Sequence, residues 1–387
     1  MTLVSPIEAG DARSLARALV RIDSRNPGLT HGGAGEAACV ELLRSVLESW
    51  GFHTEVYDAA PGRPNLLAYI GAATSDARLM LSGHLDVVGT DGMTHAPFDA
   101  VERDGRLYGR GAADMKGGIA AMCAAAWRAA QSGVTGEIVI AATADEEVES
   151  IGTRVMLERG TRADAAIVAE PTCLDIMPAH RGFVWIEVTV LGRAAHGSRY
   201  DVGVDAIRHA GLLLTELDRV DADELPRRVH PLLGRGSLHA SFIEGGIGMS
   251  TYPDRCVLRL ERRTLPGESG AQIVSEVERA CNAVRVHRRS FDARVRLVLA
   301  QDASDVAADA RIVRALGDAL RGCDEEVRVT GMSAWTDSAL LNAAGVPAIC
   351  YGPGDISLAH AAEEYIPLDE IDRATAVLTE LAHRWCG

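Results

Sequence analysis

In the first part of the chain, segments whose apolar residues have helical spacing alternate with short apolar runs typical of strands. Helical spacing predicts two amphipathic helices, over residues 11–22 and 36–50, and a third helix over 119–131. This alternation of strands and helices predicts an α/β layer structure. The predicted strands lie at residues 54–57, 65–70, 78–81, 137–142 and 165–169.

The pattern changes near residue 181. From there a strand, a helix, two strands, a helix and a strand are predicted, an order typical of a ferredoxin-like sandwich with its own core. The α/β pattern resumes after residue 300, so we expect one domain from 1–180 and 301–387 and an inserted domain at 181–300. The later predicted elements are strands at 183–191, 236–243, 255–261, 293–299, 326–330 and 348–351, and helices at 204–217, 271–284, 308–321, 337–343 and 368–385.

Composition excludes several classes of protein. The net charge of −15 argues against nucleic acid as a partner, because phosphate binding requires a basic surface. No apolar run approaches the roughly 20 residues of a membrane span, and residues Met1–Pro6 have no features of a signal peptide. Eight scattered cysteines without a C-x-x-C pair favour a reducing compartment over a disulfide framework, so we expect a cytoplasmic protein.

Polar side chains follow three of the short apolar strands. His84 and Asp86 follow the run at 79–81, Asp145-Glu146-Glu147 follow the strand at 137–142, and Glu170 follows the strand at 165–169. Three acids at one strand end usually form a solvated loop, but in open α/β sheets ligands bind at the carboxyl edge. The coincidence at three strands favours a site there. His84 and Asp86, two residues apart, can share a face, one binding a metal and the other supporting it.

A glycine-dense segment at 106–118 leads into the helix at 119–131. Its glycines allow tight turns close to another group. Considered alone, Asp114 in this segment suits the N-cap of that helix. The segment is not a phosphate loop, because the order G-x-x-x-x-G-K-[ST] is absent.

These motifs together resemble the metallopeptidase family of acetylornithine deacetylase, succinyl-diaminopimelate desuccinylase, aminoacylase and glutamate carboxypeptidase. The resemblance covers nearly the whole chain, and its ordered set of motifs is far more specific than any one of them. The motifs are Ser24-x-Asn26-Pro27, G-H-x-D at 83–86, G-R-G-A-x-D-M-K-G-G at 109–118, Asp145-Glu146-Glu147, Glu170-Pro171-Thr172, Ala195-His196-Gly197-Ser198, Pro253-Asp254 with Arg263, and Gly352-Pro353-Gly354 before Ala359-His360.

The resemblance implies a zinc-peptidase-type α/β/α catalytic domain, carrying two zinc ions, with an inserted ferredoxin-like dimerisation or lid domain. Imidazole and carboxylate ligands suit zinc, and they also accept cobalt or manganese. Asp86 would orient His84, and Glu146 would be the general base that activates a water between the metals. The implied ligands are His84, Asp114 and Glu170 for one ion, and Asp114, Glu147 and His360 for the other.

Other residues are implied to contact the substrate. His196 matches a family histidine that reaches the tetrahedral intermediate from the partner subunit, which favours a homodimer. Arg263 matches an arginine suited to grip a carboxylate, although a strand-edge ion pair is the alternative. Gly352 and Gly354 would offer N–H groups to the same carboxylate.

The chain departs from the family at two positions. Ser250 stands where many relatives have asparagine, and Trp335 stands beside the family's aspartate. Ser250 lacks the donors of an amide, and Trp335 is either an apolar substrate contact or a core residue. Both changes bear on the identity of the substrate rather than on the chemistry.

The resemblance implies hydrolysis of a linear amide by a homodimer, with removal of an N-acyl group from an amino acid or related amine. A dipeptidase or carboxypeptidase of the same family uses the same chemistry and stays open. A third alternative is a relative that binds metal without catalysis, which the presence of Glu146 and all five ligands disfavours.

Overall fold

A computed structural model describes residues 7–72 and 77–387. The expectation that no signal peptide is present rests on Met1–Pro6, which lie outside the described residues. Within the described ranges, no helix is both long and apolar enough to cross a membrane.

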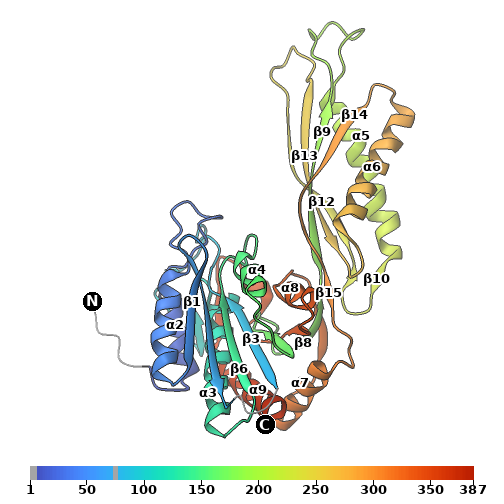
Figure 1. Ribbon diagram of the computed structural model, residues 1–387. Coiled ribbons are helices and arrows are strands. Elements are labelled where there is room, and N and C mark those ends of the chain that lie inside the picture. Colours follow the sequence, from blue (N-terminus) through green and yellow to red (C-terminus); the bar gives the residue numbers. More distant parts are fainter. Residues whose placement is uncertain (1–6, 73–76) are drawn as a thin grey trace. The chain divides into compact units, whose positions relative to one another are not determined.

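The chain divides into two compact units (Figure 1). The first comprises Met1–Pro178, Val306–Thr330 and Thr336–Gly387, and the second Ala179–Asp305 and Gly331–Trp335. The chain leaves the first unit within one strand, β8, so the second unit is an insertion in the sequence of the first.

The first unit is built on a mixed sheet in the strand order β1-β2-β6-β3-β7-β17-β8. Strand β3 runs parallel to both of its neighbours, β6 and β7, and β17 runs parallel to β7. The carboxyl ends of β6, β3 and β7 therefore meet at one edge. The strands are β1 (His53–Ala60), β2 (Arg63–Gly71), β3 (Arg78–His84), β6 (Glu137–Thr143), β7 (Ala165–Val168), β17 (Ala348–Cys350) and β8 (Ile176–His180), with β16 (Val329–Met332) paired to β8.

Helices cover both faces of this sheet. Every residue of β3 from Leu79 to His84 is buried, which requires cover on both sides, as is usual for parallel strands. Helix α3 packs against α1, α9 and β3, and α4 packs against α8, β1 and β2. The helices are α1 (Ala12–Val20), α2 (Ala37–Ser49), α3 (Gly117–Gln131), α4 (Ile151–Glu158), α7 (Arg311–Gly322), α8 (Ser338–Ala343) and α9 (Leu368–Cys386), with a short turn η4 (Ile356–Leu358).

Three features of the first unit escaped prediction: helix α4, strand β8 and a small sheet of order β18-β5-β4. The small sheet joins β4 (Val101–Arg103) and β5 (Arg106–Tyr108) to β18 (Tyr365–Pro367). These strands are three residues long, so they carry no measurable hydrophobic period. The pairing matters because it brings the segment after His360 next to the glycine-dense turn.

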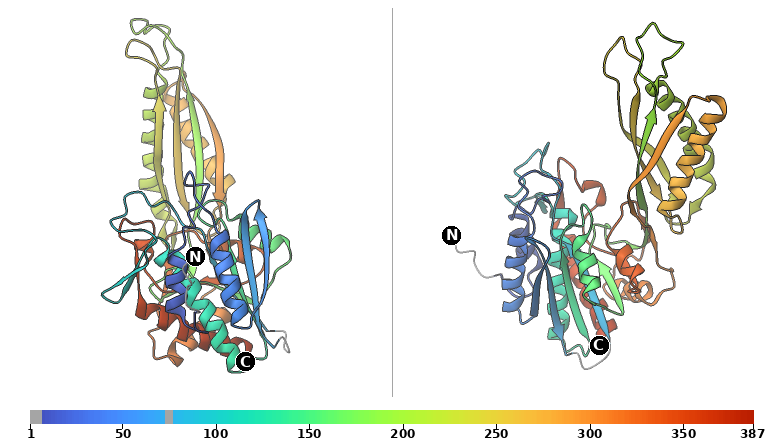
Figure 2. Two further views of the ribbon diagram at one scale, coloured as in Figure 1. Left: turned by 90° about the vertical axis from the view of Figure 1, so that its left-hand side faces the viewer. Right: turned by 45° about the horizontal axis from the view of Figure 1, so that its top comes forward.

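The main elements of the second unit have the predicted βαββαβ order, and four of its strands form an antiparallel sheet in the order β12-β13-β9-β14. Helices α5 and α6 lie side by side along one face (Figure 2). Its main elements are β9 (Gly182–Leu191), α5 (Ala206–Arg219), β12 (Ser237–Gly245), β13 (Arg255–Thr264), α6 (Gly270–His287) and β14 (Asp292–Gln301). Its shorter elements are η2 (Val220–Glu224), η3 (Leu225–Arg227), β10 (Val229–His230), β11 (Gly234–Arg235) and β15 (Ser304–Asp305).

The core of the second unit lies between this sheet and its two helices. Along β9, Val184, Ile186 and Val188 are buried against α5 and α6, while Phe183 and Trp185 alternate onto the opposite face. Among the described residues of the second unit, the long helices α5 and α6 both lie on the side of the buried residues (Figure 2). The α/β fold with an inserted ferredoxin-like unit is therefore confirmed.

Candidate functional site

The polar residues predicted at the strand ends come together at the carboxyl edge of β6, β3 and β7. His84 is the last residue of β3, Glu146 follows β6 and Glu170 follows β7. His84 is 2% exposed and Glu170 is 3% exposed. Because the three strands are adjacent and parallel, their ends deliver these side chains to one buried place.

Asp114 lies between two imidazoles. Its Oδ1 is 3.1 Å from Nε2 of His84, and its Oδ2 is 3.6 Å from Nε2 of His360. Nε2 of His360 is also 3.1 Å from Oε2 of Glu147. Among the described residues, the ligand atoms of His84, Asp114 and Glu147 all lie within 4.8 Å of one another, which makes them a candidate metal-binding group.

The alternative role of Asp114 as a helix cap does not hold. Helix α3 has Lys116 at its N-cap position, without a side-chain capping bond. Asp114 instead has the extended backbone angles φ −121° and ψ 93°, and its peptide bond to Met115 is cis. Its carboxylate faces His84 and His360.

The electrostatics of this cluster fit a bound cation. Burial raises the pKa of Glu146 and of Glu170 well above the ordinary range, and the charge of neighbouring carboxylates raises both further. Burial also raises the pKa of Glu147, although its hydrogen bond to His360 opposes the shift. Buried carboxylates this close repel one another unless a cation lies between them. The donors, imidazole nitrogen and carboxylate oxygen, are those that zinc prefers, so the residues fit the metal that the family resemblance implies.

The carboxylates of this cluster also raise the pKa of its two imidazoles. Burial lowers the pKa of His84, but its hydrogen bond to Asp114 and the charge of Glu146 outweigh burial, and the pKa lies well above the usual value. The hydrogen bond to Glu147 likewise raises the pKa of His360. Binding a metal at these nitrogens therefore requires the release of protons.

Asp86 does more than orient His84. Nδ1 of His84 lies 2.9 Å from the main-chain carbonyl of Asp86 and 3.7 Å from its carboxylate. The carboxylate accepts hydrogen bonds from the main-chain N–H groups of Glu146 (3.1 Å) and Glu147 (3.2 Å). Asp86 thus holds the imidazole with its carbonyl and the Glu146–Glu147 backbone with its side chain.

A buried network continues from Asp86 away from the cluster. Nδ2 of Asn26 donates to Asp86 at 2.7 Å and to Asp145 at 3.0 Å. Arg63 donates to Asp145 at 3.1 Å and forms a two-point ion pair with Glu36, which is fully buried. Asn26 belongs to a motif visible in the sequence. No sequence motif marked Arg63 or Glu36 as part of the network, because their partners are distant along the chain.

Glu364 is a further residue that sequence reasoning missed. It is fully buried, and its carboxylate accepts hydrogen bonds from the N–H groups of Gly111 (3.1 Å), Ala113 (3.0 Å) and Asp114 (3.2 Å). Arg110 donates to it at 2.7 Å. The only sequence signal is an acid four residues after His360. Glu364 ties the segment that follows His360 to the turn that bears Asp114.

We expect Glu364→Gln to weaken zinc binding by about 10–100-fold, because residues that orient ligands typically have effects of this size. The amide has no charge, so Arg110 loses the ion pair with its buried carboxylate partner. Titration of zinc into the metal-free protein by calorimetry measures the affinity. Glu363→Gln is the matched control, since the carboxylate of Glu363 is 59% exposed and 4.0 Å from Arg103. Equal affinities in the two variants would rule out this role.

Gly352 and Gly354 do not offer free N–H groups. The N–H of Gly352 donates to Oγ1 of Thr172 at 3.1 Å, and the N–H of Gly354 donates to Oε2 of Glu370 at 2.7 Å. The expectation that they bind a substrate carboxylate is therefore corrected. A Cβ at Gly352 would lie 2.6 Å from the carbonyl oxygen of Glu170, so this glycine allows the segment after β17 to pass close to Glu170.

In the second unit, His196 and Ser250 belong to loops that pair with each other. His196 pairs with Thr251 in an isolated bridge, and the N–H of Gly197 donates to the carbonyl of Ser250 at 2.7 Å. His196 is exposed. Its Nδ1 accepts the N–H of Ser198 at 3.3 Å, so in the neutral ring the proton resides on Nε2. The ring therefore presents Nε2–H as a donor.

Arg263 and Trp335 also lie in the second unit. Nε of Arg263 donates to Glu261 at 2.5 Å, which is the ion pair considered as the alternative, but no described residue accepts from its two terminal nitrogens. Trp335 is 9% exposed, donates to the carbonyl of Asp302 at 3.0 Å and packs edge-on against Phe183. The geometry of Trp335 is that of a core residue.

Carboxylates and imidazoles that can bind a metal lie at the carboxyl edge of the sheet in an α/β/α domain, and the chain also has a ferredoxin-like insertion. Together these features define a metal-dependent hydrolase of amide or peptide bonds. Residues 80–384 match the model of peptidase family M20/M25/M40, and the chain belongs to this family.

Two curated relatives match most of the chain. An acetylornithine deacetylase from Myxococcus xanthus is 33% identical over 358 residues, covering 90% of this chain and 92% of the relative. An N-formyl-4-amino-5-aminomethyl-2-methylpyrimidine deformylase from Halalkalibacterium halodurans is 28% identical over 381 residues, covering 89% and 88%.

Solved structures share the fold. A metallo-carboxypeptidase of the M20 family from Sulfolobus solfataricus aligns with a TM-score of 0.80 at 17% identity, covering 97% of this chain and 99% of that one. A dinuclear metal-binding peptidase of the M20 family from Bacillus subtilis aligns with a TM-score of 0.73 at 16% identity, covering 96% of each chain.

Proposed function

We propose that this protein is a di-zinc amidohydrolase that removes the acyl group from an N-acyl amino acid or related amine. The observation that carries the proposal is the position of Asp114, whose two carboxylate oxygens face different imidazoles within a buried acidic cluster. His84, Asp114 and Glu170 would hold one ion, and Asp114, Glu147 and His360 the other. The names of the two curated relatives, a deacetylase and a deformylase, support acyl removal over peptide cleavage.

When bound, the zinc ions would polarise the scissile carbonyl and make a water molecule more acidic. Glu146, whose carboxylate is 3.9 Å from Nε2 of His84, accepts a proton from the attacking water. The water oxygen bonds to the carbonyl carbon, the C–N bond breaks, and Glu146 passes the proton to the leaving amine. Asp86 fixes the backbone of Glu146 throughout, through its hydrogen bond to the Glu146 N–H.

Residues of the second unit complete this mechanism in the proposal. Nε2–H of His196, contributed by the partner subunit of a homodimer, donates a hydrogen bond to the carbonyl oxygen as negative charge develops on it. The terminal nitrogens of Arg263 pair with the substrate carboxylate. Ser250, adjacent to the His196 loop, leaves more room than the asparagine of many relatives.

The eight cysteines are all free thiols, which supports a cytoplasmic location.

A substrate panel tests the proposal. We expect release of free amine from N-acetyl, N-formyl, N-succinyl or longer N-acyl amino acids, loss of activity after chelation, and recovery when zinc, cobalt or manganese is added. Faster cleavage of dipeptides would replace the deacylase with a peptidase. Metal binding without turnover of any substrate would leave only a binding role.

A further inference from the structure

The face of the inserted sheet opposite α5 and α6 carries aromatic and charged side chains in register. Trp185 on β9 pairs across the strands with Glu261 on β13, and Phe183 pairs with Arg263. Trp185 is 42% exposed and Phe242 on β12 is 62% exposed. Large aromatic side chains left accessible in one patch commonly mark a binding surface.

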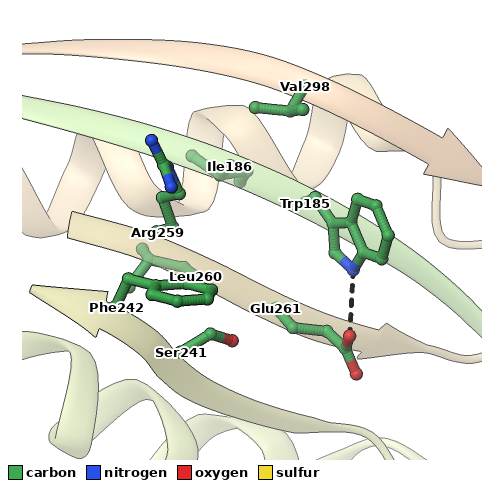
Figure 3. A pocket seen from close by; sticks show the side chains of 8 residues that line it. All are labelled: Trp185, Ile186, Ser241, Phe242, Arg259, Leu260, Glu261 and Val298. Atoms are coloured by element: carbon green, nitrogen blue, oxygen red, sulfur yellow. Dashed lines mark hydrogen bonds between the residues drawn. The ribbon is translucent and has the colours of Figure 1, made fainter. Parts of the chain in front are cut away.

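A pocket of about 300 Å³ opens on this face (Figure 3). Trp185, Phe242 and Val298 give it apolar walls, and Ser241, Arg259 and Glu261 give it polar groups. Its volume lies at the lower end of small-molecule sites, and a cavity of roughly half that size accommodates benzene. The pocket therefore suits a phenyl ring or a folded alkyl chain.

Two irregularities in the edge strands shape the pocket. The register of β12 shifts between Ala240 and Phe242, and that of β14 shifts between Leu297 and Leu299. The extra residues at these two bulges are Ser241 and Val298, and both line the pocket. Bulges re-aim side chains and are enriched beside binding sites.

Hydrogen bonds and stacking fix the pocket relative to Arg263. Glu261 accepts from Nε1 of Trp185 at 2.9 Å with one oxygen and from Nε of Arg263 with the other. The guanidinium of Arg259 lies 5.6 Å from the ring centre of Phe242. Arg263, Glu261 and Arg259 lie on the same face of β13. At the usual rise of a strand, Arg263 is about 7 Å along the strand from Glu261 and about 14 Å from Arg259.

We infer that this pocket binds an apolar or aromatic group of the substrate whose carboxylate pairs with Arg263. The inference rests on the proposed function and narrows it to N-acyl amino acids with a phenyl or medium-chain aliphatic group. The cationic Arg263 at one end and the aromatic walls at the other match a carboxylate separated by several bonds from an apolar group. The apolar group belongs either to the acyl chain or to the amino-acid side chain.

Selectivity between matched substrates tests the inference. We expect Trp185→Ala and Phe242→Ala to reduce kcat/KM for N-phenylacetyl or N-decanoyl amino acids by about tenfold relative to the N-acetyl compound, through KM, as expected for loss of aromatic burial. Trp185→Phe retains an aromatic ring and should restore most of the ratio. Val286→Ala on α6, where Val286 is 78% exposed, is the control and should leave the ratio unchanged.

The source of the apolar group follows from the same assay. A larger effect on N-acetyl-phenylalanine than on N-phenylacetyl-glycine assigns the pocket to the amino-acid side chain, and the reverse assigns it to the acyl group. Equal losses for all substrates, or no change for any of them, would overturn the inference.

A binding measurement separates this inference from the proposed function. Decanoate, titrated into the full-length protein by calorimetry, should bind the native protein, and Trp185→Ala and Arg263→Ala should each weaken this binding about tenfold or more. If no N-acyl compound is hydrolysed but decanoate binds in this way, the proposed function fails and the pocket stands. If N-acyl compounds are hydrolysed and decanoate binds all variants equally, the pocket assignment fails alone.

Discussion

Glu146→Gln is expected to lower kcat by about two to four orders of magnitude, the usual contribution of a general base. The amide cannot accept the proton of the attacking water, whereas its size matches that of the carboxylate. The backbone at this position is held independently by Asp86, so the loop should keep its conformation. Steady-state release of the amine, combined with elemental analysis, measures turnover and metal content in the same sample.

Glu147→Gln is the matched comparison, because it changes the adjacent carboxylate in the same way. Glu147 lies 3.1 Å from Nε2 of His360 and belongs to the metal-competent group, so its replacement should reduce bound metal. Glu146→Gln should retain it. Full activity of the Glu146 variant would show that another group is the base, and loss of metal from both variants would make Glu146 a ligand.

Two inactive variants, Glu146→Ala and His196→Ala, are expected to complement each other in a mixed dimer. In such a dimer one site has both substitutions, while the other combines the intact Glu146 of one chain with the intact His196 of its partner. Since one of two equivalent sites is complete, the mixed dimer should have about half of the native activity. Co-expression with two different tags isolates the mixed dimer for assay.

The same experiment gives a distinct result if His196 acts within its own chain. Each subunit of the mixed dimer would then have one defect, and activity would stay at the level of the single variants. Differently tagged dimers that both have Glu146→Ala are the control for the purification. A monomer by light scattering would contradict both the homodimer and the contribution of His196 from a partner.

Much of the fold followed from local patterns. Strands β3, β6 and β7 are continuous apolar runs, and the βαββαβ order of the insertion follows from its own periodicity. Helix α4 and the sheet of β4, β5 and β18 were missed, because they are short and are stabilised by packing with distant segments. Local sequence does not encode such contacts.

The candidate site likewise combines features that local sequence predicts with features that depend on distant contacts. The residue types at the ends of the three parallel strands could be predicted from the chain alone, because the order of strands and acids is written in it. The position of Asp114 between two imidazoles, instead of at the cap of α3, could not be predicted in this way, since it depends on contacts with the distant His84 and His360. Glu364, which lies 250 residues from Asp114, and the hydrogen-bonded N–H groups of Gly352 and Gly354 were likewise decided by folding. A buried polar group takes whichever partner the fold brings near, and its neighbours in sequence do not specify that partner.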